Sequence, residues 1–295
     1  MENPLTEGAL RFGVYLPPFG PFGDPAVLVD LALLLTCAAA GPPVAATTFA
    51  SRESDVDCQP QRAKRDDIRV AEQLAPEEPE AGPWRAKRLA AVIESLSRLG
   101  TAAHTDDRSV VLAVDGRSSS GKTILAARVQ AVVAGSAVVH TDDLAWWHSR
   151  FGWADLLIEG ILMPVHQGQP VSFRPPRWAE HGREGSIDVP ASCPLLIIEG
   201  VGAGRREAAH LVGALIWVQS DQAEAERRSV ARVGQPGGPR TVRDLREWMA
   251  EEEPFLADQR PWERANLVVA GTPQIPFDPL TELVVAQRPS GTAKT

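Results

Sequence analysis

The chain of 295 residues contains only three cysteines, Cys37, Cys58 and Cys193, and no Cys-x-x-Cys spacing. An odd and scattered set of cysteines supports neither a disulfide framework nor a zinc site. We therefore expect the protein to work in a reducing, cytoplasmic setting.

The chain also lacks an excess of positive charge, because 30 Lys and Arg residues face 38 Asp and Glu residues, for a formal net charge of -8. A surface that coats nucleic acid needs the opposite balance. We expect no nucleic-acid partner, and instead a small molecule, often an anionic one. With 44% hydrophobic residues, the chain can bury a sizeable core.

Long apolar runs are missing too. The one membrane-like stretch, residues 26–41, is shorter than the roughly 20 residues that a helix needs to cross a bilayer, and it includes Asp30. Before it stand Glu2 and Glu7 with Arg11 as the single positive residue, which is unlike the basic start of a signal peptide. The sequence predicts a soluble protein with no membrane partner.

The first part of the chain predicts little stable structure. Residues 11–34 have the pattern of a strand, a Pro/Gly turn and a helix that begins near Asp24. They resemble the first strand and helix of luciferase-like flavin or deazaflavin monooxygenases. The rest of the chain cannot supply the other units of such a barrel. We interpret residues 1–40 as a poorly packed N-terminal extension, whether a remnant, a fusion scar or a misplaced start.

Composition divides the remainder of the chain. Residues 41–82 are rich in Pro, Ala, Glu, Asp, Gln and Arg, which is typical of a disordered linker. A folded domain is expected at residues 83–272, followed by a C-terminal tail at 273–295. It opens with a helix at residues 83–100 whose apolar residues recur at helical spacing: Leu89, Val92, Ile93, Leu96 and Leu99.

The segment GRSSSGKT, residues 116–123, matches a phosphate-binding loop between an expected strand at 109–114 and an expected helix. Gly116 and Gly121 allow backbone N–H groups to surround phosphate oxygens. Lys122 should contact the β- and γ-phosphates of ATP, and the Thr123 hydroxyl should bind Mg²⁺. The loop serines complete the predicted nucleotide site: Ser118, Ser119 and Ser120. The helix should bury Ile124, Leu125 and Val129. The alternative is a serine-rich turn with a solvated lysine.

Two further short strands are followed by acidic residues. Residues 137–140 precede Asp142 and Asp143. An apolar run at residues 195–198 precedes Glu199. Because the carboxyl ends of parallel strands share one edge of a sheet, these acids should lie near the phosphate loop. One aspartate can take the proton of an acceptor hydroxyl and approach the metal, although the pair can also cap a helix. We interpret Glu199 as a carboxylate that holds a magnesium-bound water.

Strands at residues 214–220 and 265–271 complete a set of about five, separated by helical segments. Such alternation predicts a parallel sheet that is covered on both faces. The expected fold class is α/β, a three-layer P-loop NTPase fold.

Six motifs carry a resemblance to a known family: DGRSSSGKT, HTDDL, RWAEHGR, LLIIEGVGAG, AERRSVARV and RPWERANLVVAG. In order and spacing they resemble the uridine kinase-like branch of the P-loop nucleoside kinases, above all a group of actinobacterial proteins, over about residues 84–271. The resemblance implies a kinase that uses ATP and Mg²⁺ to phosphorylate a hydroxyl of a small molecule, with uridine or another nucleoside as the first candidate. It also implies that Asp142 is the general base and a metal contact, that Glu199 is the second acid, and that Arg228 and Arg232 close over ATP.

The acceptor side departs from that family. Pro176, Arg177 and Trp178 stand where the family has Tyr-Asp-Phe. An arginine in place of the aspartate reverses the charge offered to the acceptor and suits an anionic substrate. Trp146 and Trp147 can form an aromatic wall for a flat acceptor or pack in the core. The predicted substrate-binding residues are Asp143, Trp146, Trp147, Arg177, His181 and Arg183.

Two alternatives to a nucleoside kinase remain at this point. One is a kinase for another small, anionic metabolite, and the other is an ATP-binding protein without kinase activity. The glycine- and proline-rich residues 234–244 suit either a hinge beside the helix with the two arginines or a plain surface loop.

Overall fold

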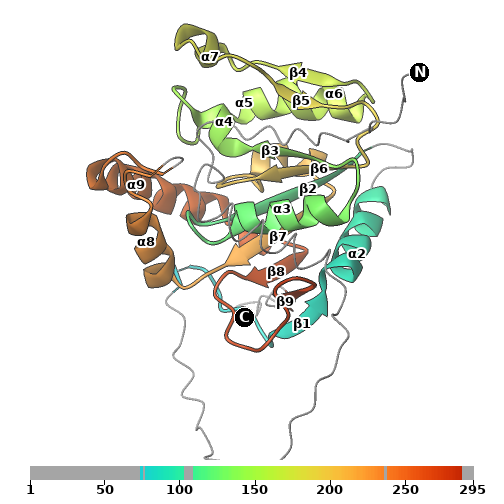
Figure 1. Ribbon diagram of the computed structural model, residues 1–295, viewed down its shortest axis with the longest axis vertical. Coiled ribbons are helices and arrows are strands. Elements are labelled where there is room, and N and C mark those ends of the chain that lie inside the picture. Colours follow the sequence, from blue (N-terminus) through green and yellow to red (C-terminus); the bar gives the residue numbers. More distant parts are fainter. Residues whose placement is uncertain (1–73, 76, 103–108, 236–237, 288–295) are drawn as a thin grey trace, which may run out of the picture. The chain divides into compact units, whose positions relative to one another are not determined.

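The computed structural model describes residues 74–75, 77–102, 109–235 and 238–287 (Figure 1). The N-terminal extension and most of the expected linker lie outside these residues, as does the end of the C-terminal tail. The chain divides into two compact units, and the one formed by residues 72–233 and 241–295 holds the sheet and the helices. In the part of the chain that is described, no helix is both long enough and apolar enough to cross a bilayer.

A seven-stranded sheet with the order β1-β9-β8-β7-β2-β6-β3 forms the centre of this unit. Its five neighbouring parallel strands are β8 (Leu267–Ala270), β7 (Ala214–Gln219), β2 (Val110–Gly116), β6 (Leu195–Glu199) and β3 (Ala137–His140). The predicted parallel sheet of about five strands is confirmed. Because β2 lies between β6 and β7, the carboxyl ends of these three strands meet at one edge.

Two antiparallel strands extend the sheet, β1 (Arg85–Arg88) and β9 (Glu282–Ala286). The sequence analysis was wrong here, since it placed residues 85–88 in a helix and 282–286 in the tail. All four residues of β1 are exposed and three of them are charged, so the strand has no hydrophobic pattern. Its pairing with β9, at the far end of the domain, orders it.

Helices cover both faces of the sheet (Figure 1). On one face, alternate residues of β2, such as Leu112 and Val114, pack against α2 (Leu89–Ala102) and α3 (Lys122–Val132). On the other face, Val111 and Ala113 pack against a helical segment made of α5 (Ala154–Leu157), the π-turn η2 (Ile158–Leu162) and α6 (Met163–His166). The three-layer α/β arrangement follows from this alternation.

Two apolar residues expected in the core are on the surface, Leu99 at 49% exposure and Ile124 at 66%. In α3 the buried face is formed by Leu125, Ala126 and Val129. Ile124 is turned from the centre of that face because each residue rotates a helix by about 100°. In α2, Gly100 is buried instead of Leu99, and a Cβ there would lie 2.5 Å from Cγ1 of Val110. This glycine permits a close approach to β2 and does not end the helix.

The short helix α4 (Thr141–Ala145) follows β3. A small subdomain, residues 171–189, packs against η2, where a Cβ on Gly160 would lie 2.7 Å from the ring of Phe173. It contains the antiparallel pair β4 (Val171–Phe173) and β5 (Ile187–Val189), with α7 (Pro176–Glu180) between them. Three further helical segments follow β6 and β7: η3 (Arg206–Leu211), α8 (Gln222–Ala231) and α9 (Val242–Gln259), with η4 (Pro261–Glu263) before β8.

A buried carboxylate ties the segment before β1 to the sheet. Oε1 of Glu78 accepts hydrogen bonds from Nε1 of Trp217 at 2.6 Å and from Nε2 of Gln219 at 3.0 Å. Its Oε2 pairs with Nη2 of Arg117 at 3.1 Å, and the N–H of Ala81 donates to Gln219 at 2.9 Å. The ordered domain therefore begins before Glu78, and the predicted linker boundary at residue 82 was too late.

We expect Glu78→Ala to lower the free energy of unfolding by about 3 kcal/mol. The substitution leaves the buried Arg117 without its counter-charge and the indole N–H of Trp217 without its acceptor, while Gln219 keeps its bond to the carbonyl oxygen of Pro79. Chemical denaturation measures the change. Glu80→Ala removes the same charge from an exposed position and should have little effect. Equal effects in the two variants would contradict the role of the buried pair.

Candidate active site

The phosphate loop, residues 116–123, connects β2 to α3 in a conformation that fits an anion. Gly121 has a φ of 103° and Ser119 a φ of 59°, both in the left-handed region. A Cβ on Gly116 would lie 2.7 Å from the carbonyl oxygen of Val218, so a glycine is needed there. The loop leads to the N-terminus of α3, where the first backbone N–H groups have no intrahelical partner. Phosphate oxygens bind well at such a helix end.

Two side chains of the loop also fit a nucleotide phosphate. Lys122 is 7% exposed, and its ammonium donates to the carbonyl oxygen of Arg117 at 2.6 Å. Ser120 is fully buried, and its hydroxyl has no hydrogen-bond partner among the described residues. A charged donor and an unpaired hydroxyl beside free N–H groups match the oxygens of a bound phosphate.

An acidic group lies directly beside the loop. Oγ1 of Thr123 donates to Oε1 of Glu199 at 3.1 Å, and Nδ1 of His140 shares a hydrogen bond of 2.5 Å with the same oxygen. Asp142 stands in the first turn of α4, immediately after β3, and interacts electrostatically with Glu199 and Lys122. The structure thus brings together the three predicted metal contacts, Thr123, Asp142 and Glu199.

The pKa values of Glu199 and Asp142 are shifted in opposite directions. Burial raises the pKa of Glu199, but the hydrogen bond and charge of His140 and the charge of Lys122 outweigh it, so the net shift is downward. Asp142 is exposed as a whole residue, but its pKa is raised, first by protein atoms that displace water around the carboxylate and then by the negative charge of Glu199. Glu199 is thereby held in the ionised form, while Asp142 becomes the better proton acceptor.

The donor set fits Mg²⁺ shared with a nucleotide. In the described part of the chain, no three His, Cys, Asp or Glu side chains form a group that could hold a metal by themselves. Mg²⁺ is commonly bound through one or two carboxylates together with water and phosphate oxygens. Thr123, Asp142 and Glu199 offer only oxygen atoms, which is the ligand type that this ion prefers.

Asp143 is engaged with the small subdomain. Its Oδ1 pairs with Nη2 of Arg183 at 2.7 Å, and its carbonyl oxygen accepts from Nε1 of Trp178 at 2.9 Å. The guanidinium of Arg183 in turn lies 3.4 Å from the centre of the Trp178 ring. Asp143 therefore has a partner of its own, whereas Asp142 lies beside the phosphate loop.

Three of the predicted substrate-binding residues form an aromatic cluster. The rings of Trp147 and His181 stack with their centres 4.7 Å apart and 10° between their planes, and Trp146 meets Trp147 edge to face at 4.9 Å. Trp147 is 38% exposed, so it is not a core residue. Arg177 forms an ion pair of 2.5 Å with Glu180 on the exposed face of α7. Its charge is balanced there and gives no argument for an anionic acceptor.

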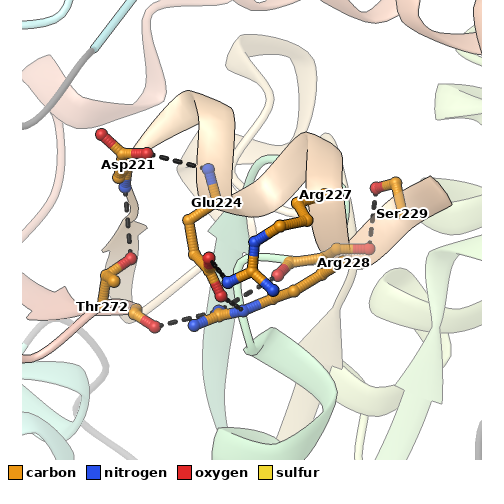
Figure 2. Close-up of polar contacts among 8 residues, drawn as sticks. Asp221, Glu224, Arg227, Arg228, Ser229 and Thr272 are labelled. Carbon is orange, nitrogen blue, oxygen red and sulfur yellow. Dashed lines mark hydrogen bonds and ion pairs between the residues drawn. The ribbon is translucent and has the colours of Figure 1, made fainter. Parts of the chain in front are cut away.

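Helix α8 also contacts the phosphate loop (Figure 2). Nε of Arg228 pairs with Glu224 at 2.7 Å, while its Nη1 donates to the carbonyl oxygen of Gly271 at 3.1 Å. The hydroxyl of Ser229 donates to that of Ser119 at 2.8 Å. Nη1 of Arg228 also lies 3.5 Å from the carbonyl oxygen of Ser119, so this arginine is beside the loop.

The start of α8 and the end of β8 are linked beside the phosphate loop. The side chain of Asp221 caps α8 by accepting from the N–H of Glu224 at 2.8 Å, and its own N–H donates to Thr272 at 3.3 Å (Figure 2). A Cβ on Gly271 would lie 2.3 Å from the carbonyl oxygen of Ser120, so β8 meets the loop at close range. Arg232, the second predicted arginine, is the half-buried C-cap of α8.

Two further residues of this site were given no role from the sequence, although His140 and Asp115 are the first residues of the motifs HTDDL and DGRSSSGKT. His140 is the last residue of β3. Asp115 is fully buried at the end of β2, and its carboxylate accepts from the N–H groups of Gly116, Gly202 and Gly204 at 2.7, 3.0 and 2.9 Å. Burial raises the pKa of Asp115 despite these bonds. One side chain thus joins the phosphate loop to the loop that follows β6.

No family model and no curated protein matches the chain. Among solved structures, a possible uridine kinase from Bacillus stearothermophilus is similar over 59% of this chain and 98% of its own, with 18% identity and a TM-score of 0.35. A putative fructose transport system kinase from Silicibacter sp. TM1040 is similar over 61% and 95%, with 18% identity and a TM-score of 0.42. The YGR205w protein is similar over 62% and 94%, with 12% identity and a TM-score of 0.37. The fold assignment rests on the strand order and the phosphate loop of this chain.

Proposed function

We propose that this chain is a cytoplasmic P-loop kinase that transfers the γ-phosphoryl group of ATP to a hydroxyl of a small molecule. One observation carries the proposal. Lys122, the Thr123–Glu199 pair and Asp142 converge at one edge of a parallel sheet. A nucleoside such as uridine is the first acceptor to test.

The nucleotide is held by the phosphate loop in this proposal. The free N–H groups at the start of α3 and the ammonium of Lys122 bind the phosphates and neutralise their charge. Thr123 and Glu199, together with Asp142, would hold Mg²⁺. The ion, when bound, stabilises the charge that develops on the phosphate oxygens. Arg228, at the rim of the loop, adds a positive charge from α8.

Asp142 acts as the base that receives the acceptor proton. As the acceptor oxygen forms its bond to the γ-phosphorus, its proton passes to the carboxylate of Asp142, and the bond between the γ-phosphorus and the bridging oxygen breaks to release ADP. The raised pKa of Asp142 and its place beside Lys122 and Glu199 favour it over Asp143, which is paired with Arg183.

The stacked pair of Trp147 and His181 supports a flat acceptor. An exposed aromatic surface binds the face of a planar ring, and a nucleobase has such a face. Arg177 is paired with Glu180 on the exposed face of α7, so anionic metabolites are included in the test below.

The decisive experiment is ADP release by the purified full chain with Mg-ATP, alone and with uridine, cytidine and a panel of hydroxylated metabolites that includes anionic ones. We expect release that depends on a nucleoside. Release with an anionic metabolite only would mean that the protein is a kinase but that its acceptor is not a nucleoside. Tight nucleotide binding without release for any acceptor would contradict the kinase and favour an ATP-binding protein.

A further inference from the structure

Glu252, in the middle of α9, contacts the phosphate loop although no part of the loop motif refers to it. Its side chain lies in an almost closed environment, with the residue 4% exposed. Its Oε1 accepts from the backbone N–H of Ser118 at 2.8 Å, and its Oε2 accepts from the hydroxyl of Ser118 at 2.5 Å. Both hydrogen-bond donors of Ser118, the backbone N–H and the hydroxyl, are therefore bound to a single carboxylate.

Trp248, one helical turn before Glu252, completes the contact. Its indole Nε1 donates to Oε2 of Glu252 at 2.6 Å and to the hydroxyl of Ser118 at 2.9 Å. The carboxylate thus accepts from three donors, as a buried charge requires. Without them, such a charge would be too costly to keep at this position.

The charge of Glu252 argues against a role as a ligand for ATP. A carboxylate beside a phosphate site repels the phosphates, and the repulsion is strong where water is excluded. In addition, Glu252 occupies the N–H of Ser118, so this donor is not available to a phosphate. The favourable contribution of Glu252 must come from the shape that it gives the loop.

The neighbours of Ser118 are also held by other elements. Arg117 is paired with the buried Glu78 from the segment before β1, and Ser119 is bonded to Ser229 of α8. Three consecutive loop residues are therefore fixed by three separate parts of the chain. Of these contacts, only the one to Glu252 involves a backbone N–H of the loop.

Helix α9 is itself well anchored, so it can serve as a support. A capping box formed by Thr241 and Asp244 closes its N-terminus. Further along, the ring of Phe255 stacks on that of Phe151 with their centres 4.4 Å apart. Glu251 pairs with Arg150. Glu252 is thereby presented to the loop from an element that has anchors of its own in the domain.

We propose that Glu252 is a positioning residue of the phosphate loop. Together with Trp248 it fixes Ser118, and this keeps the N–H groups that follow in the loop arranged for the phosphates of a nucleotide. The inference rests on the proposed function, because it requires a nucleotide in the loop.

The test is the affinity of the full chain for ADP and for inorganic tripolyphosphate, measured by calorimetry for the wild type, Glu252→Gln and Glu253→Gln. Tripolyphosphate has neither base nor ribose and reports on the phosphate site alone. We expect Glu252→Gln to lower the affinity for both ligands by about tenfold, which is the usual effect of losing one charge-assisted hydrogen bond. Glu253→Gln removes the same charge from the next, exposed residue and should bind both ligands like the wild type.

Circular dichroism at the assay temperature shows whether each variant is folded. If Glu252→Gln is not, Trp248→Phe decides, because it keeps an aromatic ring against Phe151 and removes only the indole donor. This variant should lower the affinity for both ligands by about threefold. Unchanged binding in the folded variant would overturn the inference, as would a loss for ADP without a loss for tripolyphosphate. A wild type that does not bind ADP would overturn the proposed function and this inference with it.

Discussion

Asp142→Asn should leave the affinity for ATP nearly unchanged and reduce turnover by about 10³-fold, in the range that a positioned general base contributes. The amide has nearly the size of the carboxylate and leaves Lys122 and the loop in place, but it cannot accept the acceptor proton. The rate of ADP release measures turnover, and calorimetry with a non-hydrolysable ATP analogue measures binding.

Asp143→Asn is the matched control for this substitution. It makes the same change one residue further along α4, where the carboxylate pairs with Arg183. We expect it to raise the KM for the acceptor more than it lowers kcat, because the ion pair positions the small subdomain. Normal turnover in Asp142→Asn together with its loss in Asp143→Asn would move the base to Asp143. Normal turnover in both variants would defeat the mechanism.

Lys122→Ala should weaken ADP binding by about 100-fold and reduce turnover by about 10³-fold. The buried ammonium is the positive charge that the motif places in the phosphate loop, and its electrostatic effect is large because water is largely excluded. Calorimetry and ADP release measure the two effects.

Lys87→Ala serves as the control for Lys122→Ala. Lys87 is exposed on β1, so its removal changes the net charge equally without touching the loop. Binding of ADP by Lys122→Ala at the affinity of the wild type would show that the loop does not hold the phosphates.

The parallel sheet and the phosphate loop could be predicted because each has a local signal. The five parallel strands are short, mainly apolar runs, and the glycines of the loop stand at fixed offsets from the lysine. The two antiparallel strands could not be predicted in the same way. The charged sequence of β1 becomes a strand only through its partner β9, and pairing between distant segments leaves no local pattern.

The residues of the candidate site also differ in whether a local sequence signal marks them. Lys122 could be predicted from the loop motif after β2, and Asp142 and Glu199 from their places at the ends of β3 and β6, which share one edge with β2. Glu78 and Glu252 come from segments remote in the sequence. Residues 251–253 are three consecutive glutamates, and the helical pattern gave no reason to choose the middle one. Only the rotation of α9 against the loop selects Glu252 for burial.

The strand order also has a consequence for synthesis. The strand β2 emerges from the ribosome before both of its neighbours, since β6 ends at residue 199 and β7 at residue 219. The first strand of the sheet, β1, pairs with the last, β9. Sheets that depend on such distant pairings form slowly and late. A nascent chain that ends before β7 therefore contains the whole loop motif but does not yet have a folded phosphate-binding site.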